Sequence, residues 1–171
     1  MLKLRYYGDP ILRRRATEVR AFDDALRTVA DEMLEAMTRE EGVGLAAPQV
    51  GLDMRVLVAL AMREPGDEDA EPIVVINPEI TERSHETWVY EEGCLSIPGI
   101  RGDVTRPERI VMRYRDVNGD EKTLEAIGMF ARILQHEVDH LDGKLFIDYL
   151  STAEKMLLKP KLRKIARLND E

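Results

Sequence analysis

GMFARILQHEVDHLDG, residues 128–143, carries the most specific pattern in the chain. Four apolar side chains recur there at the spacing of one helical face: Met129, Ile133, Val138 and Leu141. Gly143 is a suitable helix terminator. His136 and His140 are four positions apart, so on a helix both imidazoles face the same side. The stretch therefore predicts a helix that presents two histidines to one cation, and the plain alternative is a solvated polar face.

The segments before this helix predict strands mixed with a second helix. That helix starts near residue 22, with Asp23 or Asp24 as its N-terminal cap and Gly42 as its terminator. Strand-like runs cover residues 54–60, 72–77, 110–116 and 121–127. Between the last two runs, Asn118-Gly119 predicts a tight turn with positive φ angles, and hence a hairpin. Strands and helices without strict alternation indicate an α+β fold, which we expect to form one domain over residues 1–171.

Composition excludes several classes of protein. The chain has 171 residues, of which 44% are hydrophobic and 34% charged, as is usual for a water-soluble domain. No apolar run approaches the roughly 18 to 20 residues of a membrane span. A net charge of −8 does not suggest a DNA-binding surface. Since the first residues also lack a signal peptide's apolar core, we expect no membrane and no DNA partner, and a location in the cytoplasm or, after processing, in an organelle.

The C-terminal segment differs in charge from the rest of the chain. Residues 151–171 contain six basic and three acidic side chains, a surplus of three positive charges. Ser151 and Glu154 have the spacing of a capping box, which predicts a helix over about residues 151–168. Pro160 should kink that helix. Such a run is usually a solvated helix face, and the functional alternative is a contact with the ribosome.

A catalytic ion of the zinc type needs a third protein ligand besides the two histidines. His85 lies in a polar stretch that looks like an exposed turn, and Phe146 stands where one large peptidase group has its third histidine. Only Glu154 and Glu171 follow the motif as downstream glutamates. Cys94, the single cysteine, could be a buried apolar residue, a nucleophile or a ligand. By elimination we infer that Cys94 completes the site.

A mechanism follows from that arrangement. A bound cation lowers the pKa of its water and polarises a carbonyl group. Glu137, which points away from the two histidines, would take the proton of that water and pass it to the leaving amine. The developing oxyanion needs fixed donors, for which the candidates are the backbone N–H of Leu95 and the side chain of Gln49. From composition alone, Gln49 is better interpreted as a surface loop residue.

Three segments together resemble peptide deformylase. They are GVGLAAPQ (42–49), EGCLS (92–96) and HEVDHL (136–141), in the family's order and with similar spacing. The resemblance runs along nearly the whole chain. It implies a bacterial-type cytoplasmic hydrolase that removes the N-formyl group from the formyl-methionine of nascent polypeptides and releases formate.

The resemblance also implies roles for individual residues around the metal. The family's metal ligands match Cys94, His136 and His140. Fe(II) is the native ion in many members, and Zn, Ni or Co can occupy the same site. Glu137 matches the general base, while Gln49 and the Leu95 amide match the oxyanion donors, which reverses the surface interpretation of Gln49.

Substrate positions are implied in the same way. They match Val43, Gly44 and Leu45 in the first loop, Arg101 as a peptide contact, and Met129, Arg132 and Ile133 around the methionine side chain. Glu92, grouped with these positions, matches a residue that supports the surroundings of the metal. The short side chains of the first loop leave room beside the metal for a formyl-sized acyl group.

Three other interpretations compete with this one. A zinc peptidase of another family would share the two histidines and Glu137, but would use a third ligand other than Cys94 and cleave internal peptide bonds. A structural metal site would need a fourth protein ligand. An inactive homologue could serve as a binding module, against which the intact Glu137 and Gln49 argue.

Overall fold

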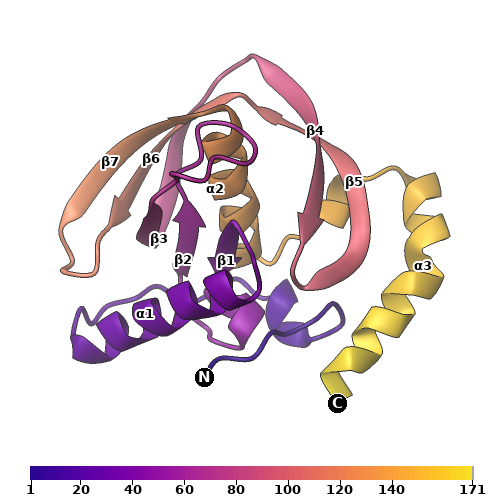
Figure 1. Ribbon diagram of the computed structural model, residues 1–171, viewed down its shortest axis with the longest axis horizontal. Helices are drawn as coiled ribbons and strands as arrows, with labels where there is room; N and C mark the ends of the chain where they lie inside the picture. Colours follow the sequence, from indigo (N-terminus) through magenta and orange to yellow (C-terminus); the bar gives the residue numbers. More distant parts are fainter. Residues whose placement is uncertain (171) are drawn as a thin grey trace.

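Two antiparallel sheets flank a central helix, α2 (Gly128–Leu141), in the computed structural model, which describes residues 1–170 (Figure 1). The larger sheet has the strand order β1 (Gly44–Ala46), β2 (Val56–Leu60), β3 (Pro72–Arg83), β6 (Arg109–Arg115) and β7 (Glu121–Ile127). The smaller sheet is the hairpin of β4 (Thr87–Cys94) and β5 (Ile97–Pro107). The expected α+β fold is therefore confirmed.

Helix α2 is buried because it packs against strands of both sheets. Ala131, Leu134 and Leu141 are fully enclosed, in one apolar cluster with residues of β2, β3, β6 and β7. The helix ends as predicted: Asp142 is its C-terminal cap, and Gly143 adopts φ = 74°, a left-handed conformation that glycine accepts without strain. The rigid α2 thus holds its histidines between the two sheets.

Helix α1 (Asp24–Arg39) covers the other side of the large sheet (Figure 1). The Asp23 carboxylate accepts the N–H of Leu26 at 3.0 Å, so the predicted N-terminal cap is confirmed. Gly42 as the terminator is wrong. The chain turns at Glu41, which takes the positive φ of 54°, and Gly42 then leads into β1.

The hairpin of β6 and β7 is confirmed, but its turn is made differently from the prediction. Only Gly119 of the Asn118-Gly119 pair has a positive φ, at 85°. The Asp116 carboxylate accepts the N–H groups of Asn118 and Asp120 at 2.9 and 3.1 Å, and so organises the turn from its first position. The predicted strand at 72–77 is also too short, because β3 continues to Arg83.

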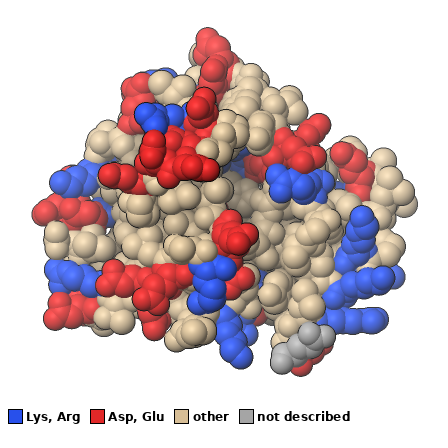
Figure 2. All heavy atoms as spheres, viewed as in Figure 1, with Lys and Arg blue, Asp and Glu red and all other residues tan. Residues whose placement is uncertain are grey.

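Helix α3 (Thr152–Ala166) lies at the edge of the molecule beside β5 (Figure 1). The capping box of Ser151 and Glu154 is confirmed. The helix runs through Pro160 without ending there, and it ends at Ala166, two residues before the predicted boundary; the kink at Pro160 stays a prediction. Figure 2 shows basic side chains along this edge. None of the helices in residues 1–170 is long and apolar enough to span a bilayer.

Four short 3-10 helices complete the described chain. They are η1 (Pro10–Arg13), η2 (Ala47–Val50), η3 (Phe146–Tyr149) and η4 (Arg167–Asp170). Two of them flank the site: η2 follows β1, and η3 joins α2 to α3. His85 was expected in an exposed turn. It is indeed exposed and lies in the connection between β3 and β4.

Candidate metal centre and active site

Three candidate ligand side chains meet between the small sheet and α2. Cys94 ends β4, while His136 and His140 lie one turn apart on α2, and one ligand atom of each residue lies within 4.8 Å of the others. The Cys94 Sγ and His140 Nε2 atoms are 3.3 Å apart. One thiol and two imidazoles are a donor set that suits a divalent transition-metal ion, and three protein ligands leave a position open for chemistry. The residues present therefore fit the expected ion.

Glu92 fixes the orientation of one of these ligands. Its buried carboxylate lies 2.9 Å from His136 Nδ1 and accepts hydrogen bonds from Arg106 and Arg132. Burial alone would raise the pKa of Glu92, but hydrogen bonds from Arg106 and His136 hold it well below its usual value. The carboxylate is therefore an acceptor, so His136 Nδ1 carries the hydrogen and Nε2 is left for a metal.

Glu137 lies beside the ligands with an unsatisfied carboxylate. Its Oε2 atom is buried and has no hydrogen-bond partner among residues 1–170. Burial raises the pKa of Glu137 to about 7, near the value that suits a proton acceptor at neutral pH. Gly44 makes room for this group, because a Cβ atom there would lie 2.5 Å from Glu137 Oε1.

Gln49 is buried against Cys94, so the surface interpretation of this residue is wrong. Its Oε1 atom accepts the N–H of Ala46 at 2.8 Å, which fixes the amide. Its Nε2 atom donates to Cys94 Sγ at 3.4 Å and to Ser96 Oγ at 3.2 Å. A fixed amide N–H donor therefore lies next to the cluster of ligands.

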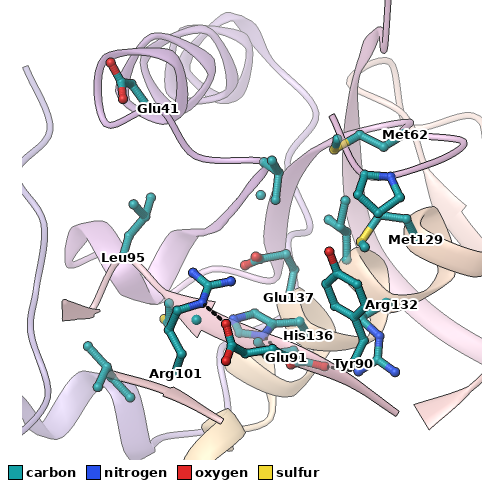
Figure 3. Close-up of a pocket in the computed structure, with 18 of the residues that line it drawn as sticks. Glu41, Met62, Tyr90, Glu91, Leu95, Arg101, Met129, Arg132, His136 and Glu137 are labelled. Carbon is teal, nitrogen blue, oxygen red and sulfur yellow. Dashed lines mark hydrogen bonds and ion pairs between the residues drawn. The ribbon is translucent and has the colours of Figure 1, made fainter. Parts of the chain in front are cut away.

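A cavity of about 570 Å³ opens onto the cluster (Figure 3). Most of the predicted substrate positions line it: Val43, Gly44, Glu92, Arg101, Met129, Arg132 and Ile133. Leu95, the predicted oxyanion donor, lines it too. Leu45 does not line it, because this side chain is fully buried against α1 and β2. In Figure 3, Tyr90 and Met62 lie close to Met129 at one end of the cavity. No motif or spacing pointed to those two residues.

Two of the lining arginines are held by other groups. Arg101 donates to Glu91 at 2.8 Å at the exposed side of the cavity. Arg132 is buried and donates to Glu92 and to the carbonyl oxygens of Trp88 and Val104. Its guanidinium is thus engaged inside the protein rather than directed at a substrate.

Comparison with known proteins decides the family. The polypeptide deformylase family model matches residues 1–156. The chain belongs to this family. A peptide deformylase of Salinibacter ruber is 49% identical, covering 96% of this chain and 88% of the relative. One from Thermotoga sp. (strain RQ2) is 46% identical, covering 98% of each. The crystal structure of a Thermus thermophilus peptide deformylase superposes with a TM-score of 0.89 at 40% identity, covering 99% of each chain.

Membership of the peptide deformylase family establishes the activity. The protein is a metal-dependent hydrolase that removes the N-formyl group from nascent peptides. A Plasmodium falciparum peptide deformylase shares the fold as well, with a TM-score of 0.87 and 43% identity over 96% of this chain and 95% of that one. The three competing interpretations, a peptidase of another family, a structural metal site and an inactive binding module, are therefore set aside.

Arg106, Asp139 and Tyr149, which surround this deformylase's site, were not predicted from the sequence either. Arg106 is 4% exposed and binds both Glu92 and Asp139. Buried arginines are rare unless they are paired, so nothing in the polar stretch RGDVTRPER pointed to it. The register of the β4–β5 hairpin explains the contact between Arg106 and Glu92. Trp88 pairs with Arg106, and Glu92 pairs with Gly102. Arg106 and Glu92 therefore lie on the same face of the hairpin.

Proposed function

We propose that Cys94, His136 and His140 hold one divalent ion, and that Fe(II) is the ion bound in the cell. The observation that supports this most is the convergence of one thiol and two imidazoles next to the unpartnered carboxylate of Glu137. Zn, Ni and Co suit the same donors. When bound, such an ion acidifies a water molecule and polarises the formyl carbonyl group.

The chain's own groups then handle the proton and the developing charge. Glu137 accepts a proton and delivers it to the amine that leaves when the formyl C–N bond breaks. Its pKa of about 7 suits both roles. The Gln49 Nε2–H and the backbone N–H of Leu95 donate hydrogen bonds to the oxyanion. Since Gln49 is already fixed by Ala46, it needs no reorganisation to do so.

Strand β1 offers a way to hold the peptide backbone. It is the edge strand of the large sheet and, within residues 1–170, pairs only with β2, so its other side is open to a further strand except where the Ala46 N–H donates to Gln49 Oε1. An extended peptide can add to such an edge. We assign this contact to the segment Val43 to Leu45, where Leu45 takes part through its backbone because its side chain is buried.

The methionine side chain of the substrate fits the apolar end of the cavity. Met129, Tyr90 and Met62 lie there and provide flexible thioether and aromatic contacts, and Ile133 also lines the cavity. Arg101, at the exposed side, is positioned for the residues that follow methionine. Because Gly44 has no side chain, Glu137 fits against β1 and room remains beside it for a small acyl group such as formyl.

The direct test compares acyl groups on one peptide. The metal-loaded protein should release formate from formyl-Met-Ala-Ser and leave acetyl-Met-Ala-Ser largely intact. An internal-bond assay on unformylated peptides serves as the control. Comparable cleavage of internal bonds would contradict the assignment, and metal analysis after anaerobic purification would identify the ion.

We further propose that the protein works in the bacterial cytosol and that α3 contacts the ribosome. The substrate is a nascent chain, and the relatives named above include bacterial proteins. Residues 151–171 carry the positive surplus, and Met156 and Leu157 of α3 are exposed. A basic helix with exposed apolar side chains suits a surface of RNA and protein.

A further inference from the structure

A chain of alternating charges connects a metal ligand to the protein surface. His136 Nδ1 lies 2.9 Å from Glu92 Oε1. The Glu92 carboxylate accepts hydrogen bonds from Arg106 Nε at 2.6 Å and from Arg106 Nη2 at 2.8 Å. Arg106 Nη1 donates to Asp139 Oδ2 at 2.9 Å. The hydroxyl group of Tyr149 donates to the same Asp139 oxygen at 2.8 Å.

Burial along this chain increases from Tyr149 to the pair formed by Arg106 and Glu92. The side chains of Arg106 and Glu92 are 4% and 5% exposed, and that of Asp139 is 15% exposed. Tyr149 is 47% exposed, and its ring lies over the Arg106 guanidinium with 5.0 Å between Cζ and the ring centroid. Tyr149 therefore covers the water-facing end of the network, by one hydrogen bond and one cation–π contact.

Glu92 has a second anchor that does not involve Tyr149. Arg132 donates to Glu92 Oε2 at 2.6 Å and is itself held by the carbonyl oxygens of Val104 and Trp88. Arg106, by contrast, donates to no backbone carbonyl oxygen within residues 1–170. Besides Glu92, its guanidinium is held by the Asp139 carboxylate and the Tyr149 ring. Tyr149 therefore contributes to the orientation of Arg106 through its ring and through its hydrogen bond to Asp139.

We propose that Tyr149 is a positioning residue of the deformylase, which holds His136 in its metal-binding orientation through Asp139, Arg106 and Glu92. The inference rests on the proposed ligand set. Within residues 1–170, Tyr149 makes no hydrogen bond to Cys94, His136 or His140 and does not line the cavity, so we assign its effect to the other three side chains.

The expected effect follows from the behaviour of groups that orient metal ligands. Loss of such partners typically weakens metal affinity by roughly 10- to 100-fold. Tyr149→Ala removes both the hydrogen bond and the ring, and it lets water reach Arg106, so we expect about a tenfold loss of affinity. Tyr149→Phe keeps the ring over Arg106 and should lose less. The KM for peptide should stay unchanged in both variants, because Tyr149 does not line the cavity.

The experiment uses Co(II) as the probe. Its dissociation constant is measured by chelator competition, and its visible spectrum reports the coordination geometry. Wild type, Tyr149→Phe and Tyr149→Ala are compared with Tyr114→Phe, a matched change at a half-buried tyrosine on β6. We expect weaker binding and an altered spectrum for Tyr149→Ala, intermediate values for Tyr149→Phe and wild-type values for Tyr114→Phe. A Tyr149→Ala protein that binds Co(II) with wild-type affinity and spectrum overturns the proposal, even if its thermal stability falls.

His136→Ala separates this proposal from the ligand assignment. If His136→Ala binds Co(II) like the wild type, the ligand set itself is wrong. If His136→Ala loses Co(II) while both Tyr149 variants bind normally, only the role of Tyr149 is wrong. Asp139→Asn provides a further check, because Tyr149→Phe should add little to a protein in which that link is already weakened. Additive losses in the double variant would contradict the proposed route.

Discussion

At the scale of single residues, the site depends on close contacts between a few side chains and the backbone around them. The carboxylate of Glu137 is wedged against Gly44 and has no partner for its Oε2 atom among residues 1–170. A buried carboxyl without a partner is costly for a fold, and such groups are usually retained for chemistry. This argues for a proton-transfer role rather than a structural role for Glu137.

Glu137→Gln tests that role without changing the shape of the side chain. The amide cannot accept a proton, so kcat should fall by at least about 10²-fold, the low end for a general base. Metal content should stay near one ion per chain, because Glu137 is not among the ligand atoms. The measurement is kcat together with metal stoichiometry. Loss of the metal along with activity would instead make Glu137 a ligand or a support of the site.

Gly44→Ala should lower catalysis by a steric clash, without changing any charge. The new Cβ would lie 2.5 Å from Glu137 Oε1 and 2.9 Å from its Cγ, so either the carboxylate or β1 must move. We expect a loss of kcat of about 10²-fold, since small misplacements of a catalytic group have effects of that size.

Gly42→Ala is the matched control for that change. Its Cβ would meet mainly Leu95 Cδ1 at 2.8 Å, the end of a flexible side chain, so the loss should be much smaller. Equal losses in the two variants would show that the segment tolerates no methyl group anywhere, and the specific argument for Gly44 would fail.

Some of these site residues could be predicted from the sequence, and others could not. The two histidines and Glu137 follow from helical spacing, and Cys94 follows by elimination. The role of Gln49 could be predicted only from the family resemblance, because no periodic pattern in the Gly-Ala loop indicates that its side chain is buried. Tyr149 could not be found at all, since its partner Asp139 comes from a different element.

At the scale of elements, predictability follows the strength of local signals. Helix α2 and the β6–β7 hairpin were predicted because apolar period and turn residues agree along each segment. Strand β5 was missed because its outward-facing positions and its buried Arg106 give a polar sequence without clean alternation. Pairing with β4, which no local pattern reveals, creates that strand. The end of α1 was wrong because Glu41 adopts a conformation that glycine usually takes.

Helix α3 allows a prediction about recruitment. Lys159, Lys161 and Lys164 lie on this helix, and replacing all three with glutamine removes positive charge without touching Leu162 or Ile165, which pack the helix onto the core. Phosphate contacts weaken steeply with salt, so co-sedimentation with ribosomes should fall both on adding salt and on this substitution. Turnover of a short formylated peptide should be unchanged.

The control for α3 is a matched triple change elsewhere on the chain. Lys3, Lys122 and Lys144 lie outside α3, and their replacement with glutamine removes the same charge. Equal weakening by both triples would point to net charge alone. Binding that resists both salt and the α3 triple would contradict a role for the helix.

At the scale of the whole molecule, the proposed ion joins two parts of the core. The histidines belong to α2, which packs in the apolar cluster of the large sheet. Cys94 packs against the cluster formed by β5, η3 and α3. An ion bound by all three side chains would therefore cross-link the two clusters, in addition to its chemical role.

Removal of the ion should consequently lower the stability of the whole fold. A ligand present at about 100 times its dissociation constant contributes about 2.7 kcal/mol to the free energy of unfolding. For a chain of this size, that corresponds to a fall in Tm of about 5 to 11 °C on complete chelation. Calorimetry before and after chelator treatment measures it, and restoring the metal should restore Tm.

Cys94→Ser gives that experiment its discriminating control. A neutral hydroxyl replaces a soft thiolate, so two histidines hold the ion alone and affinity should drop sharply. The variant should start at the Tm of the metal-free wild type, and the chelator should no longer change it. If Cys94 were only a buried apolar residue, the change would cost about 1 to 3 kcal/mol of stability, and the chelator would still lower Tm as in the wild type. Full metal occupancy with near-normal turnover in Cys94→Ser would refute both the cross-link and the ligand set.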